Sequence, residues 1–210
     1  MGSNYILPEG NVQISFSGGR TSGYMLYEIL EANNGLPDRA KVIFTNTGRE
    51  MEETLDFVQE CSDKWNVDIT WLEYDLVNGK VTYKEVSHQT SSRNGEPFEK
   101  LIQYKKVLPN VLMIFCTIEL KIRTAKRYLR NPLELGWRNW VNAVGIRYDE
   151  PTRLNAKQKK DVFTRWFPLG ENKVTAQMID DFWAKKNLGY IWGKIFLGPK
   201  FGAKKVRTFF

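Results

Sequence analysis

The sequence is poor in the two side chains that most often build metal and redox centres. Its 210 residues include two cysteines, Cys61 and Cys116, and one histidine, His88. Two cysteines exclude a disulfide-rich scaffold and a self-contained four-cysteine metal site. A single histidine without a paired nucleophile or a ligand cluster is more often structural than catalytic. We therefore expect His88 to have a packing role.

Long apolar runs are also absent. No stretch approaches the roughly twenty apolar residues of a membrane helix, and the first residues do not resemble a signal peptide. These absences predict a cytoplasmic protein that makes no membrane contact. No repeats or low-complexity tracts are visible, and the length suits one domain with at most a small appendage. We expect a main domain over residues 1–168 and a helical, basic extension over 169–210.

Aromatic residues and positive charge are plentiful. Seven tryptophans, twelve phenylalanines and a hydrophobic content of 42% supply enough apolar volume for a packed core. The formal net charge of +7 indicates an anionic partner, such as a nucleotide or a nucleic acid. Bulk charge is a weak signal, so the nature of that partner has to come from motifs.

The stretch from Val12 to Ser22 predicts a strand, a glycine-rich turn and a helix. Val12, Ile14 and Phe16 alternate as in a strand, and beyond Thr21 the apolar residues recur with helical spacing. The turn consists of Ser17, Gly18, Gly19, Arg20, Thr21 and Ser22. Backbone N–H groups at the start of a helix attract anions, and glycines at positive φ let a phosphate approach closely. Ordinary strand–helix turns also contain two glycines, so spacing alone leaves both interpretations open.

Further strand–helix units predict an α/β fold. Residues 42–44 and 69–74 have the pattern of buried strands, and Leu55, Val58 and Trp65 mark a helix between them. This order implies right-handed crossovers and a doubly wound, mostly parallel sheet, for which we expect five strands. Such sheets bind ligands beyond the carboxyl ends of their strands. The polar turn over residues 45–50 should therefore lie beside residues 17–22.

The middle of the chain combines a basic helix with a further strand. Thr117 is a candidate helix cap, and the residues after it include Lys121, Arg123, Lys126, Arg127 and Arg130. This basic face is either solvated or lines a site for phosphate or sulfate, because arginine binds such oxyanions bidentately. Residues 141–146 resemble a strand, which places Arg147 and Arg153 near the same edge of the sheet.

Several segments, in order along the chain, carry motifs of one known family. Residues 17–22 match S-G-G-x-x-S, residues 44–50 match F-x-[DN]-T-G-x-E, and residues 144–153 match G-I-R-x-D-E-x-x-R. Residues 91–98 and 115–123, the latter with C-T-x-E-L-K, resemble segments of phage and bacterial members. The chain thus resembles the phosphoadenylyl-sulfate (PAPS) reductase family, whose loop is shared with the PP-loop ATP pyrophosphatases.

The resemblance implies a Rossmann-like fold of the adenine nucleotide α-hydrolase type and an adenine nucleotide, ATP or PAPS, as ligand. It implies a phosphate or sulfate on residues 17–22 and the adenosine near residues 45–48. The implied binding residues are Ser17, Gly18, Gly19, Arg20, Thr21, Ser22, Thr45, Asn46, Thr47, Gly48, Arg93, Lys121, Arg147 and Arg153.

The chain departs from the family at its cysteines. Family members that reduce activated sulfate use a C-terminal cysteine nucleophile, and some hold an iron–sulfur cluster on four cysteines. Cys116 matches one cluster position, but Phe115 stands at the neighbouring one, and Ile195 and Gly198 stand where two others belong. We expect no iron–sulfur cluster. Cys116 is a candidate thiol through the nearby basic residues, although the family places its attacking thiol on the C-terminal tail.

A second departure concerns magnesium. ATP pyrophosphatases usually carry an aspartate at the position of Thr21. The absence of this aspartate is an argument against metal-assisted cleavage of ATP. The carboxylates of Glu50, Asp149 and Glu150 remain as groups that could hold Mg²⁺.

Two functions from different classes follow. One is an adenine-nucleotide-binding PP-loop protein that acts on its nucleotide, by PAPS reductase-like chemistry or by adenylyl or sulfur transfer. The other is a catalytically inactive nucleotide- or nucleic-acid-binding protein that keeps the fold.

In the extension, Met178, Ile179, Phe182 and Trp183 predict an apolar helix face. Residues 189–210 are basic and aromatic, which favours packing or a homo-oligomer contact over nucleic-acid binding.

Overall fold

A six-stranded sheet forms the centre of the molecule. The computed structural model describes residues 5–107, 117–157 and 160–186. Within these residues the strand order is β4-β3-β2-β1-β5-β6, and every neighbouring pair is parallel except β3 and β4. The strands are β1 (Val12–Phe16), β2 (Ala40–Asn46), β3 (Ile69–Val77), β4 (Lys80–Val86), β5 (Trp140–Val144) and β6 (Phe163–Trp166).

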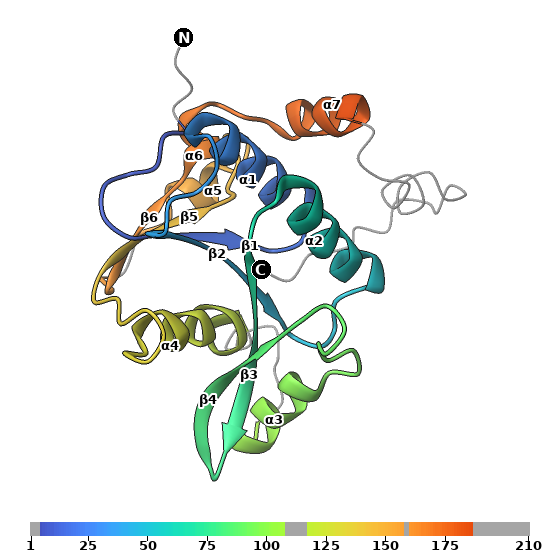
Figure 1. The fold of residues 1–210 in the computed structure, drawn as a ribbon, viewed down its shortest axis with the longest axis vertical. Helices are drawn as coiled ribbons and strands as arrows, with labels where there is room; N and C mark the ends of the chain where they lie inside the picture. Colours follow the sequence, from blue (N-terminus) through green and yellow to red (C-terminus); the bar gives the residue numbers. More distant parts are fainter. Residues whose placement is uncertain (1–4, 108–116, 158–159, 187–210) are drawn as a thin grey trace.

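Helices cover both faces of the sheet, as Figure 1 shows. The helices are α1 (Arg20–Asn33), α2 (Glu52–Trp65), α3 (Glu96–Lys105), the π-helical η1 (Thr117–Arg123), α4 (Thr124–Arg130), α5 (Pro151–Leu154), α6 (Pro168–Glu171) and α7 (Ala176–Lys186). The first two helices and α7 share one core with the even-numbered side chains of β1. A second core joins α4 to Ile43 and Leu72, which point to the opposite face. This arrangement is the doubly wound α/β fold that the sequence predicts.

The first helix packs as its pattern predicts. Met25, Leu26, Ile29 and Leu30 are all buried against the sheet and the neighbouring helices. Because these positions recur at intervals of three and four residues, they form a single stripe along the helix. The helix ends at Asn34, which adopts the left-handed conformation typical of a C-terminal cap.

The sheet has six strands among the described residues, whereas the sequence predicts five. The strands without a clear sequence signal are β4 and β6, which form the two edges of the sheet. The β3–β4 hairpin turns at Asn78 and Gly79, both at positive φ. This Asn-Gly pair is the usual signal of a tight hairpin, but the mixed polarity of Lys80–Val86 hides the strand. Only four residues form β6, too few for a period-2 pattern to stand out.

Two local predictions also need correction. The helix expected after Thr117 is present, but over Thr117–Arg123 it is π-helical and it becomes α-helical only at Thr124. In α7, Ile179 and Trp183 are buried, whereas 46% of Met178 is exposed. The apolar face of α7 is therefore narrower than the sequence predicts, since Met178 turns away from the core.

Within the extension, α7 packs on α1. Residues 189–210, where we predict packing or an oligomer contact, lie outside the described residues, and the division into 1–168 and 169–210 stays a prediction. None of the helices in the part of the chain that the structure describes is long and apolar enough to cross a membrane.

Candidate functional site

The turn between β1 and α1 requires glycine at one position. Gly18 has a φ of +72°, and a Cβ atom there would lie 2.7 Å from Thr54 Cγ2 and 3.0 Å from Val58 Cγ2, both on α2. Gly19 differs from our expectation, because its φ of −102° is open to any residue. Among the described residues, a Cβ on Gly19 would meet only Ser17 Oγ, at 3.6 Å. Packing therefore explains Gly18, whereas packing by the described residues does not explain Gly19.

The hydroxyl of Ser22 closes this turn. It donates to the Gly19 carbonyl at 2.9 Å and accepts the backbone N–H of Ser17 at 3.2 Å. The Ser17 hydroxyl lies 3.0 Å from it, and Ser22 is 4% exposed. Ser22 therefore shapes the loop from within. In this structure its hydroxyl proton is directed at the Gly19 carbonyl, and its role in binding a ligand stays a prediction.

The start of α1 provides backbone donors at the carboxyl end of β1. The first backbone hydrogen bond of the helix runs from Gly23 N–H to the Gly19 carbonyl, at 2.9 Å. The N–H groups that precede it have no intrahelical acceptor, and the first turn contains no acidic residue. The helix dipole adds partial positive charge at the same point. This geometry suits an anion.

The segment that follows β5 lies beside the same turn. A Cβ on Gly145 would lie 3.5 Å from Ser22 Cα, so the backbones approach closely. Arg147 Nη1 donates to Thr21 Oγ1 at 3.5 Å, and Arg147 Nε donates to Asp149 Oδ1 at 2.8 Å. In the sheet, β1 and β5 are neighbours, but β1 is followed in sequence by β2 on its other side. The turn thus lies at the topological switch point, where sheets of this kind bind ligands.

The buried carboxylate of Glu73 supports the turn after β2 through a hydrogen bond with Asn46. Asn46 is fully buried and donates to Glu73 Oε1 at 2.7 Å and to the Ser92 carbonyl at 2.8 Å. Its own side-chain oxygen accepts the Gly48 N–H at 3.0 Å. Thr45 lies within β2, opposite Leu72 of β3. Asn46 therefore fixes the course of the chain and does not present its amide to solvent.

Sequence reasoning missed Glu73. Its side chain is 4% exposed, and besides Asn46 it accepts the N–H of Ser92 at 2.6 Å and the Ser92 hydroxyl at 2.8 Å. An acidic residue between Leu72 and Tyr74 in a mostly apolar strand was the available signal, because buried carboxylates need several donors. Glu73 ties the segment before α3 to the sheet.

The candidate cations are all paired with carboxylates. Arg20 pairs with Asp180 at 2.5 Å, Lys121 with Glu50 at 3.5 Å and Arg153 with Glu150 at 2.6 Å. Thr47 donates to the same Glu50, at 3.0 Å, so Lys121 and the turn after β2 meet at this carboxylate. The structure thus links Lys121 to residues 45–48, and Arg147 to residues 17–22.

Arg93 lies against α2. Its Nε and Nη2 donate to both Glu52 oxygens at 2.8–3.1 Å, and its Nη1 and Nη2 donate to the carbonyls of Ser91 and His88. Arg93, through these hydrogen bonds, lowers the pKa of Glu52. The contacts of Arg93 hold its own segment to the start of α2, and none of them reaches residues 17–22.

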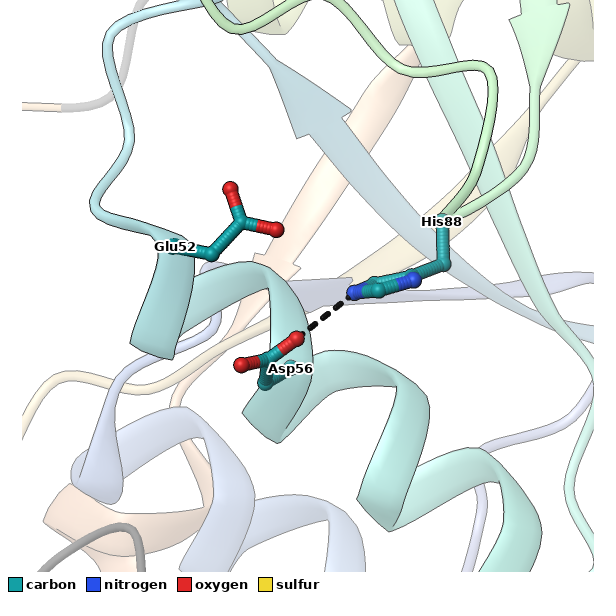
Figure 2. Close-up of side chains that lie close together, drawn as sticks. All are labelled: Glu52, Asp56 and His88. Atoms are coloured by element: carbon teal, nitrogen blue, oxygen red, sulfur yellow. Dashed lines mark hydrogen bonds and ion pairs between the residues drawn. The ribbon is translucent and has the colours of Figure 1, made fainter.

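His88 completes this contact, as Figure 2 shows. Its Nε2 lies 2.8 Å from Asp56 Oδ1, and its ring packs edge-on against Trp71. Glu52, Asp56 and His88 offer ligand atoms that all lie within 4.8 Å of one another. A cation placed there would have to displace the Arg93 guanidinium from Glu52. The geometry agrees with a packing role for His88.

The two cysteines have different standing. Cys61 is fully buried in the core between α1, α2 and the sheet, and this burial raises the pKa of its thiol. A thiol that stays protonated in an apolar core is a poor nucleophile and a poor metal ligand. Cys116, the candidate thiol, lies outside the described residues.

Comparison of the sequence with known proteins identifies the family of this chain. The model of the phosphoadenosine phosphosulfate reductase domain matches residues 11–191, which include the turn, both neighbouring strand ends and α7. The chain belongs to the phosphoadenosine phosphosulfate reductase domain family. Its motifs at residues 17–22, 44–50 and 144–153 are thus features of a family member.

Two similar proteins illustrate the range of this likeness. The chain is 30% identical over 171 residues to the uncharacterized nin region protein ORF290 of Escherichia phage lambda, covering 73% of this chain and 58% of that protein. It therefore spans less than two thirds of that relative. A solved structure, the U34-tRNA thiolase NcsA from Methanococcus maripaludis with its [4Fe-4S] cluster, is 14% identical with a TM-score of 0.45. That likeness covers 86% of this chain and 57% of the thiolase, and at this TM-score it carries no conclusion about the site.

Proposed function

We propose that this chain binds an adenine nucleotide, ATP or a PAPS-like molecule, at the turn between β1 and α1. The observation that supports this most strongly is the start of α1, whose first N–H groups have no acceptor within the helix, at the switch point between β1 and β5. Backbone N–H groups and the helix dipole favour a phosphate or a sulfate there. Membership of the family supports a nucleotide as the molecule that carries it.

The surrounding residues suggest an orientation for the ligand. Within the described ranges, Gly19 leaves space above the turn, bordered by Ser17 Oγ at 3.6 Å from the position of a Cβ. The hydroxyl of Thr21 would add a further hydrogen-bond donor. Residues 45–48 at the end of β2 would lie near the adenosine. Lys121, Arg147 and Arg153 would neutralise the remaining charge, each by turning from its present carboxylate. Arg93 would contribute only after leaving Glu52.

If the protein is an enzyme, we propose attack at the α-phosphate or group transfer from an activated nucleotide. The chain would contribute mainly the position of the reacting groups and the stabilisation of negative charge. Mg²⁺ bound with the nucleotide would have Glu50, Asp149 and Glu150 as candidate ligands, all of which now contact cations. Binding of such an ion would release those cations toward the phosphates.

The second candidate is a protein that binds a nucleotide or a nucleic acid without catalysis. The replacement of the family's C-terminal cysteines by Ile195 and Gly198 favours it, because thiol chemistry needs a thiolate. The two candidates share the same binding site. Sulfite release from PAPS in the presence of thioredoxin, lost on Cys116→Ser, would favour the reductase over the inactive protein.

Titration of the purified protein tests the proposal. We expect binding, measured by calorimetry and as a rise in melting temperature, from at least one of ATP, AMP, adenylyl sulfate and PAPS, with and without Mg²⁺. A ligand at about 100 times its Kd stabilises the folded state by about 2.7 kcal/mol. For a domain of this size that corresponds to a rise of about 5–10 °C. No response to any of the four would contradict the proposed function.

We also expect no iron–sulfur cluster. Cys61 is enclosed in the core, and one further cysteine cannot supply the four thiolates of a [4Fe-4S] centre. Protein purified without oxygen should be colourless and hold less than about 0.1 iron per chain by metal analysis. A brown sample with about four irons per chain or per dimer would contradict this.

A further inference from the structure

We propose that Asp180 is an internal counter-ion of Arg20 that weakens the binding of an anion at the turn. In this inference, which rests on the proposed function, the ligand's oxyanion and the Asp180 carboxylate compete for one guanidinium. Asp180 lies on α7, far from the turn in sequence, yet its Oδ1 is 2.5 Å from Arg20 Nη1. Arg20 is the first residue of α1, directly after Gly19.

The packing of α7 on α1 places Asp180 beside Arg20. A Cβ on Gly23 would lie 3.0 Å from both Phe57 Cζ and Trp183 Cζ2, so the absence of a side chain lets α7 approach. The Trp183 indole N–H donates to the Arg20 carbonyl at 3.1 Å. Phe182 packs edge-on against Tyr24, with ring centroids 4.8 Å apart. These contacts fix the backbone of α7 next to Arg20.

The other end of α7 is attached to the segment that carries Arg147. Asp149 Oδ2 accepts the N–H of Ala176, the first residue of α7, at 3.0 Å, while its Oδ1 accepts Arg147 Nε at 2.8 Å. The Tyr148 N–H donates to the Val174 carbonyl at 2.9 Å. Both sides of the turn are thus joined to the same helix. The position of Asp180 is therefore set by the segments that flank the site.

The pair is weak enough for a ligand to break. The side chains of Arg20 and Asp180 are 31% and 47% exposed, so solvent screens their attraction. A phosphate or sulfate at the start of α1 would lie beside Arg20 and could bind it through two hydrogen bonds, in a geometry as favourable as that of a carboxylate. While Asp180 holds Arg20, the ligand has to displace it. Removal of the carboxylate should therefore tighten binding.

Matched variants test this in the full-length chain. ATP and PAPS are titrated by calorimetry, with and without Mg²⁺, against the parent, Asp180→Asn and Asp181→Asn. Asp181 is the next residue on α7, and Gln177 Nε2 donates to its side chain at 2.8 Å. We expect Asp180→Asn to lower the Kd of the better ligand about two- to fivefold, the range of an exposed ion pair, and Asp181→Asn to change it less than about 1.5-fold.

A second background separates competition from a general charge effect. In Arg20→Gln, adding Asp180→Asn should leave the Kd unchanged, because the contested guanidinium is gone. A loss of packing at α7 could only weaken binding, so tighter binding is a signature that a structural role does not produce. An unchanged or raised Kd in Asp180→Asn, or an equal fall with Asp181→Asn, would overturn the inference while leaving nucleotide binding in place. A parent that binds neither ATP nor PAPS would overturn the inference, and one that binds none of the four nucleotides would overturn the proposed function as well.

Discussion

Replacing Gly19 with valine is expected to abolish the response to nucleotide while the protein stays folded. Gly19 has an extended backbone with a φ of −102° and a ψ of 161°, which valine adopts readily. Within the described part of the chain, its Cβ would meet only Ser17 Oγ, at 3.6 Å, an ordinary contact. The added methyl groups would instead occupy the space above the N–H groups of the first turn, where we place the phosphate.

The measurement is the shift in melting temperature and the Kd for the best ligand of the four-nucleotide panel. We expect the shift to fall from several degrees to none and the Kd to rise more than about 100-fold, which corresponds to about 2.8 kcal/mol. Without ligand, Gly19→Val should lose no more than about 1 kcal/mol, the range of a less favourable N-cap residue. A normal shift in Gly19→Val would remove the turn from the proposed site.

Gly18→Ala provides the contrast at the adjacent position. Its φ is +72°, and its Cβ would lie 2.7 Å from Thr54 Cγ2, so alanine there should destabilise the ligand-free fold. The two variants should therefore differ in effect: Gly18→Ala lowers the stability of the fold, whereas Gly19→Val lowers the affinity for the nucleotide. Equal loss of stability in both would indicate that packing alone requires the two glycines.

Replacing Glu73 with leucine is expected to cause the largest loss of stability among these changes. The carboxylate is 4% exposed and accepts three hydrogen bonds, from the Asn46 amide, the Ser92 N–H and the Ser92 hydroxyl. Leucine would leave these donors buried without an acceptor, at about 1–3 kcal/mol for each donor that stays buried. We therefore expect a total loss of about 3–5 kcal/mol in urea unfolding.

Two further variants make this result specific. Glu73→Gln keeps one oxygen for Asn46 and the Ser92 N–H, and its amide can donate to the Ser92 hydroxyl, so we expect a loss of only about 1 kcal/mol. Glu85→Leu, at an exposed position of the neighbouring strand β4, should change stability by less than about 0.5 kcal/mol. If Glu73→Leu unfolded at the same urea concentration as Glu85→Leu, the hydrogen bonds of Glu73 would not hold this region together.

The sequence by itself determined the elements whose signals are local. The alternation of Val12, Ile14 and Phe16, followed by the stripe that includes Met25 and Ile29, predicted β1 and α1 correctly, because one buried face imposes one period. The order of strands and helices predicted the doubly wound sheet, since parallel strands need crossover helices. The motifs predicted the family that the domain match shows. The edge strand β4 was missed because an edge tolerates mixed polarity, and β6 was missed because four residues are too few to show a period.

Only the tertiary structure decided which side chains face one another. Glu73 meets Ser92 and Asn46, Arg93 meets Glu52, and Asp180 meets Arg20 across 160 residues of sequence. From the sequence alone, a carboxylate or a guanidinium could equally well face solvent, bind a ligand or pair with a side chain of opposite charge. Their partners depend on distances set by the packing of helices on the sheet, and composition and spacing do not contain those distances.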